Sequence, residues 1–423
     1  MTKNHKIKAG SLQFVLFIGA VIAVLLLTFV LLSHSHIFFA KKSNKFMEVI
    51  ECNSFSVKLA LQPNGKAIAS NNNSYEKDGI STEVKKGLWG VFDHYTAVSS
   101  FEKINFSSSV LVGYGVDETL PALYLKDNQR PLIVAGNTKI VGNAVLPQQG
   151  IRPGTISGNS YFGNRLVHGT ITQSTAILPN LESEKEKNIK YLCGPFSPKN
   201  GVVPLTPSRN SSYSNSFLQP TKYITGDYIN LTSVSLTGNI IVVASREIQV
   251  DASSNLQDII LAAPTISIKN NTKGTFQAFA SKRIEVGNNC ILNYPSALVL
   301  HETATDQQQN QPNLAPLFVG SGSIIKGILI YQKRSEEKMF YPQIKINTNA
   351  TVIGQLHCEK NVELKGEVRG SVYTDGFMAL ENGSIYQNHL YNGSIDFNQL
   401  QEQFVGLGWN DTAAPKKIAK WLY

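Results

Sequence analysis

The sequence lacks the short motifs that accompany most enzyme chemistries. It contains no Gly-x-Ser-x-Gly turn, no His-Glu-x-x-His pair and no phosphate-binding glycine loop. Gly113, Tyr114 and Gly115 lack the third glycine of a dinucleotide-binding loop, so we interpret them as the end of a strand. We therefore expect a non-enzymatic chain with no catalytic residue, no cofactor, no metal site and no small-molecule substrate.

Acids and histidines are too scattered to suggest a catalytic pair. A paired-carboxylate site needs two acids about 5–9 Å apart, and the acids of the repetitive region are isolated: Asp251, Asp258 and Glu285. Hexapeptide acyltransferases place a catalytic histidine between solenoid coils, and His301 and His357 could be nominated. Strand alternation directs His357 outward while Leu356 and Cys358 point inward, so His357 is expected to be solvated.

Cysteine is scarce, and no two cysteines form a Cys-x-x-Cys pair. The four are widely spaced: Cys52, Cys193, Cys290 and Cys358. An even count is compatible with disulfides, but a chain of 423 residues is large enough to fold without them. A buried thiol is the favoured interpretation of Cys358.

Acidic residues are absent from the first 47 positions, which contain six lysines. The net charge of +9 therefore leaves only +3 for residues 48–423. No basic stripe interleaved with aromatics occurs in that larger part, so nucleic-acid binding is not expected.

One long apolar run, from Leu12 to Leu32, has no charge between Lys8 and Lys41. At about 1.5 Å per residue, its 21 residues would span a bilayer core of about 30 Å. The run is longer than the apolar part of a cleaved signal, and the site that follows it is weak, so a retained helix in the lipid bilayer is predicted. Lysines flank both ends, and we favour the short tail inside and the long domain outside.

A short pattern repeats in residues 239–300. Residues 244–250 (Ala-Ser-Arg-Glu-Ile-Gln-Val) are matched by residues 262–268 and 280–286, an offset of 18 each time. Small or aliphatic residues also recur about every sixth position. Repeats this short must stack to share a core, and three short strands per turn explain both periods. The predicted fold is all-β, a three-sided parallel β-helix with one N-terminal transmembrane α-helix; an evenly spaced β-sandwich is the alternative.

The first residues form a basic leader that ends in Gly10 and joins the apolar run directly at Ser11. This leader and the start of the apolar run resemble the N-terminal segment of type IV prepilins and pseudopilins. The resemblance implies peptidase cleavage between Gly10 and Ser11. The family's usual glutamate, five positions after the cleavage point, is Val15 here, and some minor members also lack it. A plain signal anchor with a chance glycine is the alternative.

The run from Ile344 to Val372 alternates aliphatic residues and glycine, and this part of the chain resembles the bactofilins. Those are polymer-forming bacterial cytoskeletal proteins built as a compact three-sided β-helix. The resemblance implies the fold, and it implies self-association only if the ends of the stack are uncapped. A tail from Leu400 to Tyr423, weakly amphipathic, is predicted to cap one end.

These patterns divide the chain into five parts. They are a basic leader (1–10), a transmembrane helix (11–33), a stalk and membrane-proximal domain (34–125), an interrupted β-helix (126–397) with loops near 181–220 and 303–316, and a C-terminal cap or tail (398–423).

The predicted function is a structural or assembly component of a bacterial envelope machine, similar to a pseudopilin of a type IV pilus or type II secretion-like system. Its N-terminus would be cytoplasmic, its single helix would cross the inner membrane, and its body would be periplasmic or surface-exposed. Partners would be other subunits of that machine or further copies of the chain. The alternatives are a bactofilin-like cytoskeletal scaffold and a surface carbohydrate-binding β-helix.

Overall fold

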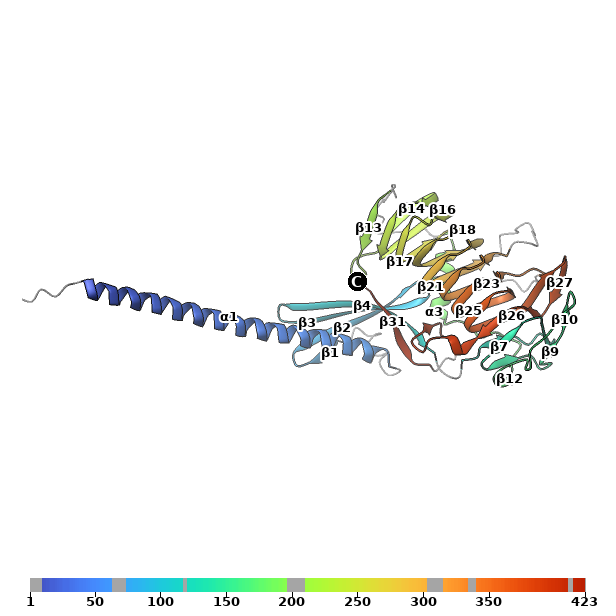
Figure 1. Ribbon diagram of the computed structural model, residues 1–423, viewed down its shortest axis with the longest axis horizontal. Helices are drawn as coiled ribbons and strands as arrows, with labels where there is room; N and C mark the ends of the chain where they lie inside the picture. The colour runs from blue at the N-terminus through green and yellow to red at the C-terminus, as the bar shows by residue number, and fades with distance from the viewer. Residues whose placement is uncertain are drawn as a thin grey trace, which may run out of the picture.

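A computed structural model describes residues 10–62, 74–116, 120–195, 210–302, 315–333, 340–409 and 414–422. Figure 1 shows one long helix projecting from a head that is built almost entirely of strands. The leader residues before Gly10 and most of the predicted loop at 303–316 lie outside the described residues.

The long helix, α1 (Gly10–Ala60), has 51 residues and runs without interruption from the apolar segment into the head. At about 1.5 Å per residue it is about 75 Å long. Its most apolar window has a mean hydropathy of 3.2, and none of that window is buried. The helix is thus long and apolar enough to cross a membrane, and it continues beyond residue 33 through the predicted stalk to Ala60.

The second half of α1 lies on an antiparallel meander that forms the part of the head nearest the helix. Its strands are β1 (Ser74–Lys77), β2 (Ile80–Trp89), β3 (Phe92–Phe101) and β4 (Ile104–Gly115). Val57 and Ala60 of the helix pack against Val84, Ala97 and Val110 of the sheet, all of them buried. This apolar contact fixes the helix on one face of the sheet.

The C-terminal tail completes this sheet instead of capping the stack. Both β30 (Val405–Gly406) and β31 (Lys416–Leu422) pair antiparallel with β4. The tail therefore covers a sheet edge, as its amphipathic pattern suggested, but the edge belongs to the membrane-proximal sheet. Segments from near the two ends of the chain are thus neighbours in one sheet.

The rest of the head is a β-helix-like solenoid of parallel strands. In chain order they are β5 (Leu123–Leu125), β6 (Leu132–Ala135), β7 (Lys139–Val141), β8 (Ala144–Leu146), β9 (Ile151–Pro153), β12 (Ile171–Gln173), β13 (Ser212–Asn215), β14 (Lys222–Leu231), β15 (Ser235–Gly238), β16 (Ile240–Val250), β17 (Asn255–Ala262), β18 (Thr265–Ile268), β19 (Lys273–Ala280), β20 (Arg283–Val286), β21 (Ile291–Glu302), β22 (Leu317–Val319), β23 (Ile324–Lys333), β24 (Ile344–Ile346), β25 (Thr351–Leu364), β26 (Glu367–Glu381), β28 (His389–Tyr391) and β29 (Ser394–Asp396). Smaller elements are the hairpin β10 (Thr155–Ile156) and β11 (Asn159–Ser160), β27 (Ser384–Gln387), helix α3 (Ser183–Cys193) and the 3-10 turn η2 (Phe397–Gln399).

The sequence repeat corresponds to one turn of the solenoid. Ile248 pairs with Ile266, and Ile266 pairs with Ile284, so each isoleucine lies beside its equivalent in the next repeat. The predicted match of Ala244 with Ala262 is displaced by a single position, because Val243 is the partner of Ala262. The match of Ala262 with Ala280 is displaced as well, because Phe279 is the partner of Ala262. The extra residue in this second case is Asp258, which interrupts the register of β17 against β19 and has a φ of 61°. A bulge of this kind inserts one residue and displaces the rest of the strand.

The turns are not stacked in the order of the sequence. Leu123 of β5 pairs with Val372 of β26, and Ile140 of β7 pairs with Ile395 of β29. The first turns of the chain therefore lie beyond the last ones, at the end of the solenoid opposite β13. The predicted excursion at 181–220 contains α3, which packs beside β19 and β21.

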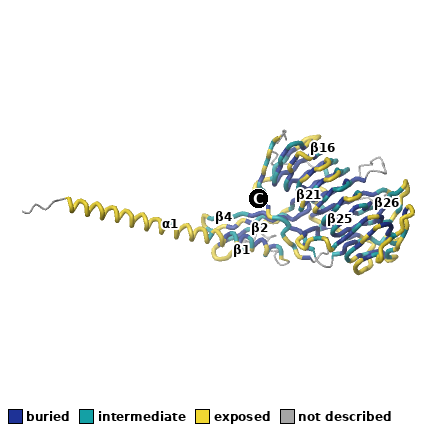
Figure 2. Tube along the Cα trace, in the orientation of Figure 1, coloured by how far each residue is buried: buried dark blue, intermediate teal, exposed yellow. Residues whose placement is uncertain are grey.

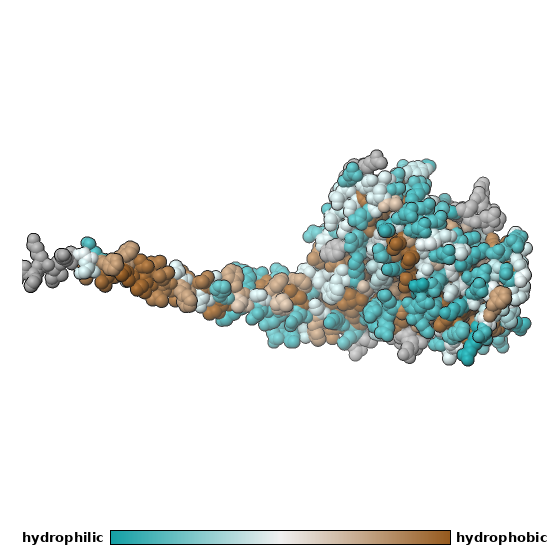
Figure 3. Space-filling model, in the orientation of Figure 1, coloured by the Kyte–Doolittle hydropathy of each residue, from teal (hydrophilic) through white to brown (hydrophobic). Residues whose placement is uncertain are grey.

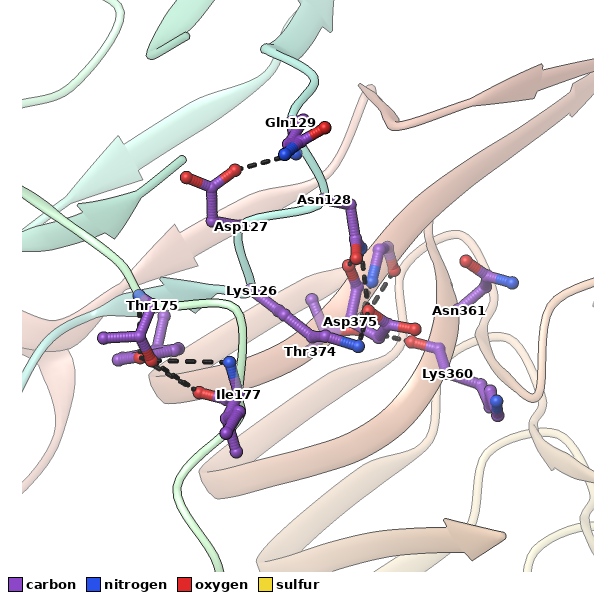
Figure 4. A network of polar contacts seen from close by, with 12 residues as sticks. Lys126, Asp127, Asn128, Gln129, Thr175, Ile177, Lys360, Asn361, Thr374 and Asp375 are labelled. Carbon is purple, nitrogen blue, oxygen red and sulfur yellow. Dashed lines mark hydrogen bonds and ion pairs between the residues drawn. The ribbon is translucent and has the colours of Figure 1, made fainter. Parts of the chain in front are cut away.

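Polar contacts hold this seam between early and late turns (Figure 4). Lys126 forms an ion pair of 3.1 Å with Asp375, and the Asn128 amide donates to the carboxylate and the backbone oxygen of Asp375 at 2.7 and 2.8 Å. The backbone N–H of Lys126 donates to the oxygen of Thr374 at 3.0 Å. The solenoid thus has a closing contact that joins segments far apart in the sequence.

Two layers of apolar side chains stabilise the head. The first fills the solenoid and includes Leu356 and Cys358, both fully buried. The second lies outside the strands, where Ile330 and Tyr373 are covered by Trp409 and by α3. Figure 2 shows the resulting contrast between the buried strands of the head and the exposed first half of α1.

Candidate functional site

The exposed half of α1 is the largest apolar surface of the described chain. Figure 3 shows it as a continuous brown rod outside the mixed surface of the head. Phe14, Leu25 and Phe29 are 62–70 % exposed, and no charged residue lies between Gly10 and Ala40. A surface of this kind is stable only in lipid or against other apolar helices.

The predicted cleavage position lies at the start of this surface. The helix begins at Gly10, and both Gly10 and Ser11 are exposed in its first turn. A Cβ at Gly10 would meet no atom within 4 Å, so the position has space around it.

A second site is the joint between the membrane-proximal sheet and the solenoid. The β2–β3 turn reaches the solenoid through Trp89, whose indole N–H donates to the backbone oxygen of Asp258 at 3.2 Å. The side-chain oxygen of Gln277 accepts a hydrogen bond from the backbone N–H of Val91 at 2.9 Å, and its side-chain nitrogen donates to the backbone oxygen of Trp89 at 3.0 Å. Trp89 and Gln277 are buried, so these hydrogen bonds are made away from competing water.

Charged groups from the C-terminal strand reinforce the joint. The Lys420 ammonium lies 2.7 Å from both carboxylate oxygens of Asp258, and Lys416 contacts the Asp93 carboxylate. The Asp93 and Asp258 side chains are each 1 % exposed. Removing one partner of such a pair leaves a buried charge, which typically costs about 3–5 kcal/mol.

The start of α3 adds a third contact to the joint. The Tyr114 hydroxyl donates to Glu182, while the Lys185 ammonium lies 3.1 Å from the same carboxylate. Burial opposes ionisation of Glu182, but Lys185 and the Tyr114 hydroxyl hold its pKa below the usual range. Lys86 and Glu184 form a further ion pair of 2.6 Å. Strands from three regions of the chain therefore meet in one rigid connection.

The chain matches no protein-family model, no curated protein and no solved structure.

Asp258 is the residue of this joint that sequence reasoning missed. We interpreted it as an isolated acid, whereas it is both the bulge of β17 and the anchor of Trp89 and Lys420. The available signal was its position directly before the aliphatic run from Ile259 to Ala262. A buried acid needs a partner, but the partner lies 162 positions away and has no local signature.

The two nominated histidines are not neighbours in the stack. His301 pairs with Gln332, while His357 pairs with Ile330 on one side and Tyr373 on the other. The expectation that His357 is solvated is wrong, because its side chain leaves the solenoid but is covered by Trp409, with ring centroids 5.2 Å apart. Burial lowers the pKa of His357 to about 4.

The remaining acids and thiols are also accounted for locally. Glu285 lies 3.1 Å from Arg283, and Asp251 accepts a hydrogen bond from the Ser253 hydroxyl at 2.6 Å. Within the described ranges, no group of three or more His, Cys, Asp or Glu side chains is placed to hold a metal ion. All four cysteines are free and buried, which confirms the buried thiol predicted at Cys358.

Proposed function

We propose that this chain is a membrane-anchored, non-enzymatic assembly subunit of a bacterial envelope machine, similar to a pseudopilin of a type IV pilus or type II secretion-like system. The N-terminus would be cytoplasmic, α1 would cross the inner membrane, and the head would be periplasmic or surface-exposed. Partners would be other subunits of the machine or further copies of the chain.

The observation that supports this proposal best is the division of α1 into two halves with different surroundings. The first half is apolar and exposed, so it needs lipid or neighbouring helices. The second half is seated on an antiparallel sheet through Val57 and Ala60. A filament subunit requires both properties, because its helix must move between lipid and a helical bundle while its head stays rigid.

The head suits a structural role because its strongest interactions connect elements. The buried polar groups of the joint are paired with one another: Asp258 with Lys420, and the Gln277 amide with the backbone oxygen of Trp89. We infer further that each solenoid turn has three faces. The register of β19 against β21 breaks between Gly274 and Gln277, which divides this strand between two of them.

Leader cleavage tests the proposal. The full chain would be co-expressed with a prepilin peptidase, and its intact mass would be measured. The proposal expects the loss of residues 1–10, with Ser11 as the new N-terminus, and no loss in a Gly10→Leu variant. A Gly19→Leu variant is the matched control and should be cleaved like the parent chain. An uncleaved parent chain would remove the pseudopilin interpretation.

A bactofilin-like scaffold is the second candidate, supported by the parallel solenoid alone. Electron microscopy of the full chain in detergent separates the two candidates. End-to-end filaments formed by the heads would favour the scaffold, and dispersed single particles would favour the assembly subunit.

A further inference from the structure

The end of the solenoid farthest from the membrane helix has an unusual charge. We call residues 151–173 the distal cap; they include β9, the β10–β11 hairpin and β12. Figure 1 places these strands at the end of the molecule opposite α1. From Asn128 to Leu181 the sequence contains four arginine or lysine residues and no aspartate or glutamate.

Hydrogen bonds of Tyr161 bring the backbone near Arg152 and the backbone of Arg165 close together. Its backbone N–H donates to the oxygen of Gly154 at 3.1 Å, close in sequence to Arg152. Its hydroxyl donates to the backbone oxygen of Arg165. The backbone N–H of Phe162 donates to Gly136 at 3.4 Å, which ties the segment to the solenoid.

These two arginines are available for a ligand. Both are exposed, and neither forms an ion pair within the part of the chain that the structure describes. Acids on adjoining segments are already used, because Glu381 pairs with Lys365 at 2.7 Å and Asp396 lies 3.7 Å from Lys139. The cap therefore presents unneutralised guanidinium groups.

The cap also exposes apolar and amide side chains. Phe162 is 71 % exposed and Ile171 is 52 % exposed. Asn159, Asn164 and Thr172 are also exposed. Guanidinium groups bind carboxylate and phosphate, aromatic faces stack on sugar rings, and amides bond to hydroxyls.

We propose that the distal cap binds an acidic polysaccharide, with Arg152 and Arg165 on its anionic groups and Phe162 against a sugar ring. The net charge of the cap itself, +2 over residues 151–173, is small for nucleic acid, which is bound through a dense basic surface. The inference is independent of leader cleavage and of filament assembly. Polysaccharide binding can therefore fail while the proposed function holds, and the proposed function can fail while binding holds.

Binding of polygalacturonate, a uronic-acid polymer, to the full chain in detergent micelles tests this site. Saturable binding is expected, and the Arg152→Gln/Arg165→Gln variant should weaken it by about tenfold or more, because two charge-assisted contacts are lost. Phe162→Ala should weaken it further, while dextran, a neutral polymer, should bind neither protein.

The matched control is Lys273→Gln/Lys326→Gln, which removes the same charge from exposed positions on the solenoid body. It should bind like the parent chain. Absence of saturable binding, or an equal loss in the control variant, would overturn the proposal. Tighter binding of duplex DNA than of polygalacturonate would also overturn it, because the cap would then be a nucleic-acid surface.

Discussion

At the residue scale, buried polar side chains determine how the elements fit together. Asn53 of α1 is fully buried and donates to the Ala97 oxygen at 3.2 Å and to the Ser99 hydroxyl at 3.0 Å. It also accepts a hydrogen bond from Ser108. Apolar contacts alone would allow the helix to slide along the sheet, whereas these directional bonds select one position.

Asn53→Leu should therefore destabilise the docking of α1. The substitution leaves Ser99, Ser108 and the Ala97 oxygen without this partner, at a cost of about 2–3 kcal/mol. Limited proteolysis of the full chain should show faster cleavage near residue 60. Lys58→Leu, on the exposed side of the helix, is the control. Equal resistance of Asn53→Leu and the parent would contradict the assigned role.

His357 should make the head sensitive to acid. Its pKa is about 4 in the folded chain, against an ordinary value of 6.5. The unfolded chain therefore takes up the proton first, and stability is lost as the pH falls from about 6.5 to about 4. A shift of this size corresponds to about 3 kcal/mol.

His357→Leu should remove that loss, since the side chain at this position lies beside Ile330 and under the ring of Trp409. Denaturant unfolding at pH 7 and pH 4 measures the difference, with the exposed His168→Leu as the control. An unchanged pH dependence of the His357→Leu variant would show that the buried ring is not responsible.

At the element scale, the C-terminal strand β31 connects the two parts of the head. It completes the sheet beside β4 and brings Lys420 to Asp258. The pairing with β4 holds β31 in the membrane-proximal sheet, and the Lys420–Asp258 ion pair joins β31 to the solenoid. Together they oppose rotation of one part on the other.

A double-mutant cycle measures this connection. Asp258→Asn and Lys420→Gln should show a coupling energy of about 2 kcal/mol in unfolding, because their carboxylate and ammonium groups are in direct contact and largely buried. The cycle of Asp258→Asn with the exposed Lys417→Gln should give a coupling near zero. Additive effects in the first cycle would mean that the ion pair does not stabilise the joint.

Local patterns predicted the elements better than their assembly. The spacing of Ile248, Ile266 and Ile284 identified a stack with a regular turn, and the apolar run identified the exposed helix. The burial of His357 could not be predicted, because its cover comes from Trp409, which is distant in sequence. The pairing of β31 with β4 could not be predicted either, because a strand of seven residues carries no sequence signal for its partner.

At the scale of the whole molecule, the stack is closed by its own beginning. Strand β5 pairs in parallel with β26, so the first and last turns of the solenoid stabilise each other. The order of the sequence alone would place these turns at opposite ends. The closure also brings the distal cap to the end of the head farthest from α1 (Figure 1).

Asp375→Ala tests this closure. It removes the ion pair with Lys126 and the hydrogen bond from the Asn128 amide to the Asp375 carboxylate, which together stabilise the seam by about 2 kcal/mol. Hydrogen exchange of residues 123–128 should then accelerate by about thirtyfold. The exposed Glu402→Ala is the control. Acceleration confined to β25 would contradict the observed order of turns.

The side of the membrane on which the head lies is the most direct test of the proposed function. All four native cysteines are buried, so a single exposed cysteine, Lys326→Cys, can be labelled with a membrane-impermeant maleimide. The full chain would be expressed in bacterial cells and labelled in spheroplasts, with a cytoplasmic enzyme as the control for intact membranes. The pseudopilin-like function predicts labelling before lysis. Labelling only after lysis would place the head in the cytoplasm and contradict that function.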